Sequence, residues 1–173
     1  NSIFGVRCIM TSNGIDPYVV PMRKKHYFQR STIRLLGVAK LERWHGYDRI
    51  IKGMKEYYDK PKDVSVEFHI VGDGAEYGNL VRLVQELKLK DRVVFHGPLF
   101  GEELTEIFNE CDIGIGSLGM HRIGLTDGYT LKLREFVSRG IPFVYAYNDK
   151  LIESCANGYY LKIPNDESNM RIE

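Results

Sequence analysis

The sequence predicts an α/β fold, in which a Rossmann-like, doubly wound parallel sheet carries helices on both faces. Two observations predict it. From Thr32 onward, short apolar runs rich in valine, isoleucine and phenylalanine alternate with longer segments whose apolar residues recur at helical spacing. The chain also has 173 residues, of which 43% are hydrophobic, so a single domain of this length can bury a sizeable core.

The alternation continues without an internal repeat or a low-complexity tract. Predicted strands cover residues 32–38, 64–71, 93–96, 113–116, 141–145 and 159–163. Predicted helices cover residues 47–58, 77–87, 102–109 and 130–139, with a short one over 150–156. Ligands bind beyond the carboxyl ends of the strands in such a sheet, so the loops that follow each strand are where function should be sought.

Residues 1–31 lack this regularity and are interpreted as an entry segment to the domain of residues 32–173. Residues 4–10 could form a strand, and the Asn-Gly pair at position 13 is typical of a turn. The short basic run at 22–26 is most simply the solvated face of a linker. The chain begins without methionine and stops in a polar run, so we expect a domain excised from a longer protein.

Composition disfavours several classes of protein. The net charge of +1 gives no support to nucleic acid as a partner. No apolar run approaches the roughly 20 residues that a membrane-spanning helix needs. Cys8, Cys111 and Cys155 form neither a CxxC pair nor an even set, so we interpret them as reduced thiols rather than disulfide partners. A cytoplasmic protein is therefore expected.

The loop after the first predicted strand carries a cation. Lys40 follows that strand, and His45-Gly46 comes shortly after it. A lysine can hold phosphate through a charge-assisted hydrogen bond, whereas a neutral histidine donates one bond without a fixed charge. We therefore favour Lys40 as a phosphate contact and His45 as a weaker one. The alternative for Lys40 is an ordinary surface lysine.

Glycines follow the next two predicted strands. Gly72-Asp73-Gly74 allows a tight turn and a close approach of backbone to ligand. The dinucleotide-binding fingerprint Gly-x-Gly-x-x-Gly is incomplete because its last position is Tyr77, so a dinucleotide-dependent Rossmann enzyme is disfavoured. His96-Gly97 ends the third strand, where a single histidine is more often a structural residue than a catalyst.

The most informative stretch begins at Asp127 and runs into the predicted helix that contains Glu135. Asp127-Gly128 is typical of a turn, so the helix begins near Thr130, and its unpaired N–H groups form a ready site for an anion. Glu135 lies eight positions after Asp127, a separation of roughly 12 Å if both residues were helical. The two acids would then be too far apart to share a proton, but well placed to hold two ends of one long polar ligand.

This acid-x7-acid pair, followed by Gly140 and Pro142 before an apolar strand, resembles the donor-site motif of retaining GT-B glycosyltransferases of family 4. The Gly-Asp-Gly turn, the Val-x-Phe-x-Gly run at the third strand and the Asn-Gly-Ile-Asp run at 13–16 are similar to other segments of that family. The chain departs from the pattern in two places. Asp127 stands where a glutamate is usual, and His45-Gly46 stands where Lys-Gly is usual.

The resemblance implies the C-terminal, donor-binding half of a GT-B enzyme. Lys40 and, more weakly, His45 would hold the donor diphosphate, Glu135 would hold the ribose hydroxyls and Asp127 the transferred sugar. The remaining implied donor contacts are Gly72, Asp73, Gly74, His96, Gly97, Tyr129, Thr130 and Leu131.

The implied reaction is a retaining hexosyl transfer from a nucleotide diphosphate sugar to a glycan or lipid-linked acceptor, in bacterial polysaccharide synthesis. No cofactor and no metal are implied. The acceptor would bind mainly to the missing N-terminal domain, so the isolated domain is expected to be inactive. Peripheral association with the inner face of the membrane is a further expectation. Two alternatives stay open, namely a sugar-nucleotide epimerase of the same architecture and a nucleotide-binding module without chemistry.

Overall fold

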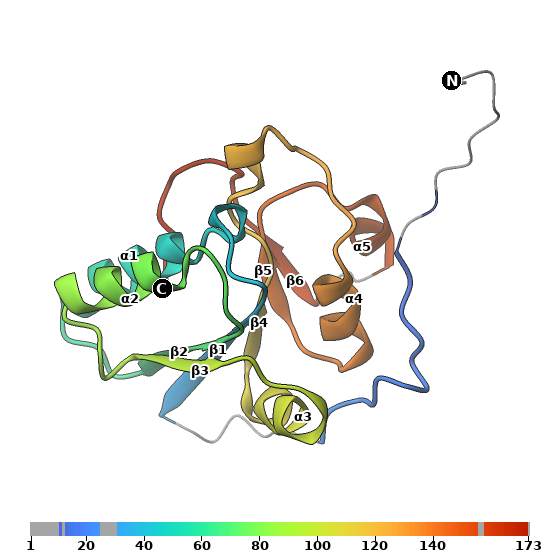
Figure 1. The fold of residues 1–173 in the computed structure, drawn as a ribbon, viewed down its shortest axis with the longest axis horizontal. Helices are drawn as coiled ribbons and strands as arrows, with labels where there is room; N and C mark the ends of the chain where they lie inside the picture. The colour runs from blue at the N-terminus through green and yellow to red at the C-terminus, as the bar shows by residue number, and fades with distance from the viewer. Residues whose placement is uncertain (1–10, 12, 25–30, 156–157, 173) are drawn as a thin grey trace.

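The computed structural model describes residues 11, 13–24, 31–155 and 158–172. Within them, parallel strands form one six-stranded sheet in the order β3-β2-β1-β4-β5-β6 (Figure 1). The strands are β1 (Thr32–Val38), β2 (Ser65–Val71), β3 (Val93–Gly97), β4 (Ile113–Ile115), β5 (Phe143–Tyr145) and β6 (Tyr160–Lys162). The chain winds outward from β1 to β3 and then crosses back to place β4 against β1. The point of reversal therefore lies between β1 and β4.

Helices cover both faces of the sheet (Figure 1). They are α1 (Tyr47–Tyr58), α2 (Tyr77–Glu86), α3 (Gly101–Glu110), α4 (Leu131–Ser138) and α5 (Lys150–Cys155), with the 3-10 helices η1 (Arg43–His45) and η2 (Met120–Ile123). The predicted fold class is confirmed, and every predicted strand and helix from residue 32 onward occurs with ends that differ by at most two residues. The strand proposed at 4–10 lies outside the described residues.

Alternation along each strand separates two hydrophobic cores. Val66, Phe68 and Ile70 of β2 point to one face, whereas Glu67 and His69 point to the other, as the two-residue period of a strand requires. The first core packs β1–β3 against α1 and α2 and contains Leu35, Tyr47, Ile50, Ile51, Met54, Phe68, Ile70 and Leu80. The second packs the other face against α3, α4 and α5 and contains Leu36, Phe108, Leu133, Phe136, Phe143 and Ile152. Both cores end at the carboxyl edge of the sheet.

The segment after β6 returns across α1, which the sequence pattern does not predict. Arg49 of α1 is only 1% exposed and donates to the carbonyl oxygens of Ser168 at 2.5 Å and Pro164 at 3.0 Å. The segment crosses the helix at Gly53, where a Cβ would lie 1.9 Å from the carbonyl oxygen of Met170. The polar run at the end of the sequence is therefore part of the packed domain.

Candidate functional site

The loops after β1 and β2 hold each other in place. The Leu41 N–H donates to the Asp73 carbonyl at 2.7 Å, and the Ala39 N–H donates to the Val71 carbonyl at 3.0 Å. Gly72 has a φ of 120°, and a Cβ there would lie 1.8 Å from the Ala39 carbonyl oxygen. Glycine is thus required at this position by the approach of the neighbouring loop, because any side chain would collide with backbone.

A cavity of about 420 Å³ opens at the carboxyl ends of β1, β2 and β3. It is lined by Val38, Ala39, Lys40, Val71, Gly72, Asp73, Pro98, Leu99, Phe100 and Leu104. Most of these side chains are apolar, with Lys40 and Asp73 as the charged exceptions. The Lys40 side chain is 82% exposed, and its ammonium lies 3.9 Å from the nearest Glu42 carboxylate oxygen. A mostly apolar hollow with a few polar groups, beyond the ends of parallel strands, is the usual form of a small-molecule site.

The predicted residues at the end of β3 separate into two environments. The Gly97 carbonyl accepts a hydrogen bond from the Gly72 N–H at 2.8 Å, which joins Gly97 to the wall of the cavity. His96 does not line the cavity and instead pairs with His69, with 2.9 Å between Nε2 of His96 and Nδ1 of His69. Burial, and then the neighbouring His69, lower the pKa of His96. The structure therefore pairs His96 with a neighbouring strand residue, away from the residues that line the cavity.

Asp127 lies in an extended loop that pairs with the segment after β5. Asp127 bridges Asn148, and the Gly128 N–H donates to the Asn148 carbonyl at 3.0 Å. The exposed Asp127 carboxylate accepts a hydrogen bond from the Thr126 hydroxyl at 2.7 Å. Because Asp127 precedes α4 and is not helical, the separation expected for two helical acids does not apply. The carboxylate lies at the carboxyl edge of the sheet, beyond β5.

The start of α4 carries the other predicted residues of this loop. Thr130 is the N-terminal cap of the helix, but no side-chain hydrogen bond caps the first turn. The Thr130 hydroxyl instead pairs with the Tyr147 hydroxyl at 2.5 Å, and the Tyr129 carbonyl accepts from the Asn13 amide at 2.5 Å. Leu131 is 57% exposed. Uncapped N–H groups at the first turn of a helix favour an anion.

Glu135 lies within α4 and is partly exposed. Its Oε1 accepts hydrogen bonds from Arg139, and the Arg139 guanidinium lies 4.2 Å from the centre of the Phe108 ring. Phe108 belongs to α3, so this face of α4 turns toward α3. Leu104 of the same helix α3 lines the cavity. Glu135 therefore lies on the α3 side of α4, but it is not among the residues that line the cavity.

His45 is almost fully buried and is held in η1. Its Nδ1 accepts from the Glu42 N–H at 3.1 Å, and its carbonyl accepts from the Leu118 N–H at 2.9 Å. Burial, together with the positive charge of Lys132, lowers the pKa of His45 to about 3. The imidazole is therefore neutral near pH 7, so among the described residues that line the cavity Lys40 is the cation.

Lys132, in the first turn of α4, is not among the residues selected from the sequence. Its ammonium is inaccessible to solvent, has no hydrogen-bond partner among the described residues and lies 5.8 Å from the centre of the Tyr47 ring. Lys132 precedes Glu135 by three positions and Arg139 by seven, so the three share one face of the helix. This spacing was visible in the sequence, but the burial of the ammonium depends on the packing of α4 against α1 and η1.

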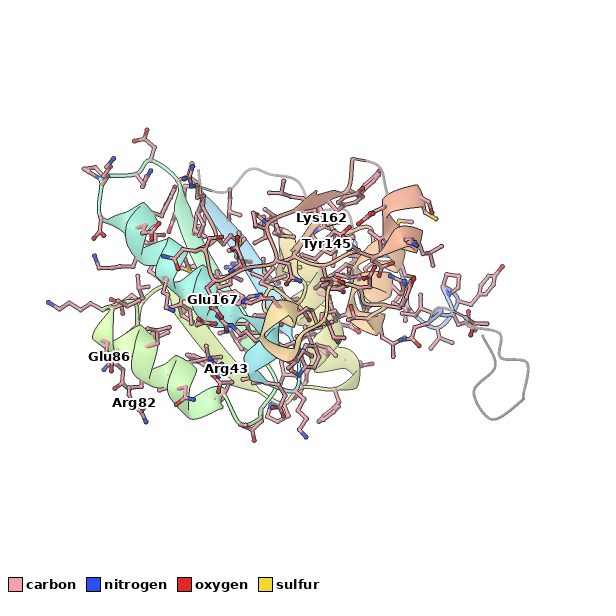
Figure 2. All side chains as sticks on the ribbon, turned by 90° about the horizontal axis from the view of Figure 1, so that it is seen from above. Arg43, Arg82, Glu86, Tyr145, Lys162 and Glu167 are labelled. Atoms are coloured by element: carbon pink, nitrogen blue, oxygen red, sulfur yellow. The ribbon has the colours of Figure 1, made fainter. Side chains whose placement is uncertain are left out.

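A second hollow, of about 390 Å³, lies between α1, α2 and the C-terminal segment. Figure 2 labels four of the residues that line it, namely Arg43, Arg82, Glu86 and Glu167. Arg122 donates to Asp48 at 2.7 Å and to Glu167 at 2.5 Å, and the hydrogen bond from Arg122 is the main cause that lowers the pKa of Glu167 to about 2. Acidic and basic groups offset one another here, so this hollow has no clear preference for a charged ligand.

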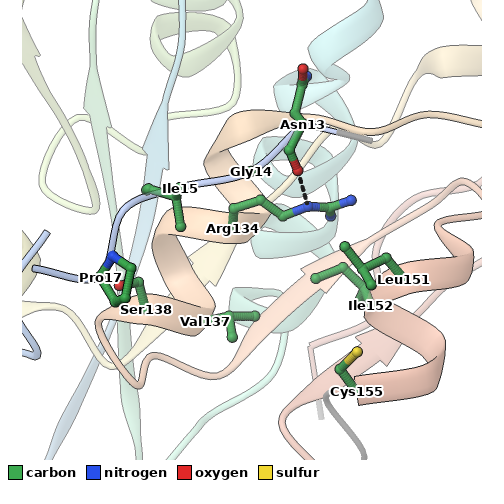
Figure 3. Close-up of a pocket in the computed structure, with 10 residues that line it drawn as sticks. All are labelled: Asn13, Gly14, Ile15, Pro17, Arg134, Val137, Ser138, Leu151, Ile152 and Cys155. Carbon is green, nitrogen blue, oxygen red and sulfur yellow. Dashed lines mark hydrogen bonds between the residues drawn. The ribbon is translucent and has the colours of Figure 1, made fainter. Parts of the chain in front are cut away.

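A third hollow, of about 320 Å³, lies between the entry segment, α4 and α5 (Figure 3). Its walls are mainly apolar and come from Ile15, Pro17, Val137, Leu151 and Ile152. The Arg134 guanidinium donates two hydrogen bonds to the Asp149 carboxylate, at 2.5 and 3.0 Å, and its Nε donates to the Asn13 carbonyl at 3.3 Å. The described residues that line this hollow therefore offer no free cation for a phosphate, in contrast to the cavity beside Lys40.

The fold and the cavity at its carboxyl edge define a Rossmann-like α/β domain of the kind that binds its ligand between the loops that follow the strands. The family described as glycosyl transferases group 1 matches residues 32–170, and the chain belongs to this family. A search of curated proteins gives no significant match.

Solved structures share the fold at low sequence identity. The Anabaena protein HepE in complex with UDP is 20% identical, with a TM-score of 0.58 over 80% of this chain and 37% of HepE. The C-terminal domain of LpcC, a group 1 family protein from Francisella tularensis, is 16% identical, with a TM-score of 0.61 over 89% of this chain and 82% of that domain. Sucrose-phosphate synthase from Thermosynechococcus elongatus is 21% identical, with a TM-score of 0.61 over 77% of this chain and 32% of the synthase. The chain thus spans about a third of the length of HepE and of the synthase. Within its described residues, no helix is long and apolar enough to cross a membrane.

Proposed function

We propose that this domain binds the nucleotide diphosphate sugar donor of a retaining GT-B glycosyltransferase of family 4. The observation that carries the proposal is the 420 Å³ cavity beside Lys40, at the carboxyl ends of β1, β2 and β3, in a chain of the group 1 family. HepE, which shares the fold, was crystallised in complex with UDP, and this supports the same ligand class for this chain.

The geometry suggests a role for each end of the donor. The apolar walls of the cavity suit the flat face of a nucleobase, and the Gly72 turn keeps the backbone close to it. Glu135, on the α3 side of α4, would accept hydrogen bonds from the ribose hydroxyls. Lys40 and the uncapped first turn of α4 would hold the diphosphate, and Asp127 would accept hydrogen bonds from the transferred sugar.

The proposed chemistry is electrostatic. As the sugar leaves, negative charge develops on the diphosphate, and a cation together with oriented N–H groups lowers the energy of that state. Retention of configuration, transfer to a glycan or lipid-linked acceptor in bacterial polysaccharide synthesis, and the absence of a cofactor are parts of the same proposal. The free thiols of Cys111 and Cys155 agree with a cytoplasmic location.

We also propose that residues 1–173 alone do not transfer sugar. The cavity lies at an open edge of the domain, and the chain spans 37% of HepE. Efficient transfer needs a positioned acceptor and a site closed to water, which a second domain would supply. Release of nucleoside diphosphate with formation of a glycosidic bond by this chain alone would contradict this part of the proposal.

The direct test is calorimetric titration of the domain with UDP, GDP and ADP and with uridine, guanosine and adenosine. We expect one base to be preferred and its diphosphate to bind at least tenfold more tightly than its nucleoside, because the diphosphate adds charge-assisted hydrogen bonds. The proposal is wrong if none of the three diphosphates binds more tightly than its nucleoside. Lys90→Met, at an exposed lysine between α2 and β3, is a matched control that should bind like the wild type.

A further inference from the structure

Three buried polar groups without partners belong to segments that start where the sheet reverses direction or pack against that point. The Lys132 ammonium, the Tyr47 hydroxyl and the Ser117 hydroxyl are inaccessible to solvent and have no hydrogen-bond partner among the described residues. The residues Tyr47 and Ser117 are 1% and 0% exposed. Buried polar groups are nearly always paired in folded proteins, because an unpaired one costs free energy. Three such groups in neighbouring segments therefore require an explanation.

Their positions follow from the strands. A Cβ placed on Gly37, near the carboxyl end of β1, would lie 2.8 Å from the Tyr47 hydroxyl oxygen. Gly37 pairs with Ile115 at the end of β4, and Ser117 follows two residues later. The Lys132 ammonium, from the first turn of α4, lies 5.8 Å from the Tyr47 ring centre. The group therefore lies beyond the ends of β1 and β4, where ligands of doubly wound sheets bind.

We infer that Lys132 is a second cation that holds the diphosphate of the donor, in addition to Lys40, and that the Tyr47 and Ser117 hydroxyls donate hydrogen bonds to the same ligand. The inference rests on the proposed function and adds a residue from α4 to it. The two phosphate groups of a diphosphate carry more negative charge than Lys40 alone can balance, and the neutral His45 does not provide a second cation.

The surroundings of Lys132 explain why a phosphate would be held there. The titratable groups that face it are His45 from η1 and Tyr47 from α1, and neither carries a negative charge near neutral pH. The ammonium is thus desolvated without a counter-ion among the described residues, and burial lowers its pKa to about 7. An arriving diphosphate would supply the missing negative charge and raise that pKa again. Binding above pH 7 should therefore draw a proton onto Lys132.

The decisive variant is Lys132→Met, which keeps the unbranched apolar stem of the side chain and removes the charged end. The diphosphate of the preferred nucleoside should bind about 10- to 100-fold more weakly, as expected for the loss of one charge-assisted hydrogen bond, while the nucleoside itself binds as before. The melting temperature of the free protein should rise, because an unpaired buried charge is removed. Lys132→Gln should show the same loss of diphosphate affinity if the methionine variant folds poorly.

A second measurement separates binding from packing. Titration of the wild type with the diphosphate at pH 8, in two buffers of different ionisation enthalpy, should reveal proton uptake that is absent in Lys132→Met and present in the control Lys90→Met. Equal diphosphate affinity in wild type and Lys132→Met would overturn the inference while leaving the proposed function intact. An equal loss for nucleoside and diphosphate would assign Lys132 a structural role only. Failure of the wild type to bind any diphosphate would instead overturn the proposed function itself.

Discussion

The carboxylate of Glu135 accepts two hydrogen bonds from Arg139, from Nε at 3.0 Å and from Nη2 at 2.9 Å. The Arg139 side chain is only 6% exposed, so Glu135 is the counter-ion of a nearly buried guanidinium. A glutamate assigned to ribose on the basis of sequence is thus also part of the packing between α4 and α3. Its removal should affect both stability and binding.

Glu135→Gln should lower the free energy of unfolding by about 1–2 kcal/mol, because it leaves a buried cation with one neutral acceptor in place of a charged one. Chemical denaturation of the two proteins measures the change. The matched comparison is Glu86→Gln, at an exposed position in α2, which should lie within about 0.5 kcal/mol of the wild type. A similar loss in both variants would mean that the Arg139 contact contributes nothing.

The binding role of Glu135 can be measured separately from its structural role. Glu135→Gln should weaken the preferred ribonucleoside diphosphate, because an amide offers a weaker acceptor than a carboxylate. The 2′,3′-dideoxy form should bind wild type and variant nearly alike, since it has no hydroxyls to lose. If calorimetry shows an equal loss for both ligands, Glu135 does not bind ribose.

Lys40→Ala should weaken diphosphate binding about 10- to 100-fold and leave nucleoside binding unchanged, since the lost contact is to phosphate. The Lys40 side chain is 82% exposed, so thermal stability should stay the same. Titration with the diphosphate and with the nucleoside distinguishes the two ligands. Equal weakening of both would indicate that Lys40 shapes the loop instead of holding phosphate.

The Gly72 turn gives a prediction about stability with a built-in control. Gly72→Ala should destabilise the domain by more than about 2 kcal/mol, because φ is 120° and the new Cβ would lie 1.8 Å from the Ala39 carbonyl oxygen. Gly78→Ala, in α2, meets no atom within 4 Å and should instead stabilise by about 0.5–1 kcal/mol. Comparable unfolding midpoints for the two variants would contradict the account of the turn.

Much of the fold could be predicted because apolar periodicity is a local property of the sequence. The alternation after Thr32 located the strands and helices within one or two residues, and β5 begins just after Pro142, which has no N–H to give to a sheet. The loops that line the cavity followed from the rule that ligands bind at the carboxyl edge. Lys40, Gly72 and Asp73, chosen on that basis, do line one cavity.

What could not be predicted depends on contacts between distant segments. No local pattern marks Arg49 as buried, but the returning C-terminal segment covers it. Lys132 is buried because α4 packs against α1 and η1, which lie about 80 residues earlier in the chain. The His96 ring contacts His69 because β2 and β3 are neighbours in the sheet. No local sequence pattern specifies which strands pair.

The buried imidazole of His45 should make the stability of the domain depend on pH. Its pKa is lowered from 6.5 to about 3 in the folded protein, so between these values the unfolded chain binds a proton that the folded protein does not. Stability should therefore fall as the pH falls below about 6.5. Between pH 7 and pH 5, where most carboxylates stay ionised, the His45 contribution to this loss is about 2 kcal/mol.

The variant His45→Gln tests this account. It keeps an acceptor for the Glu42 N–H but does not titrate, so it should be less stable than the wild type at pH 7 and lose less stability on going to pH 5. Urea unfolding of both proteins at the two pH values measures the difference. An equal loss of stability in the wild type and in His45→Gln would show that His45 is protonated in the folded protein at pH 5. Burial would then not lower its pKa as described.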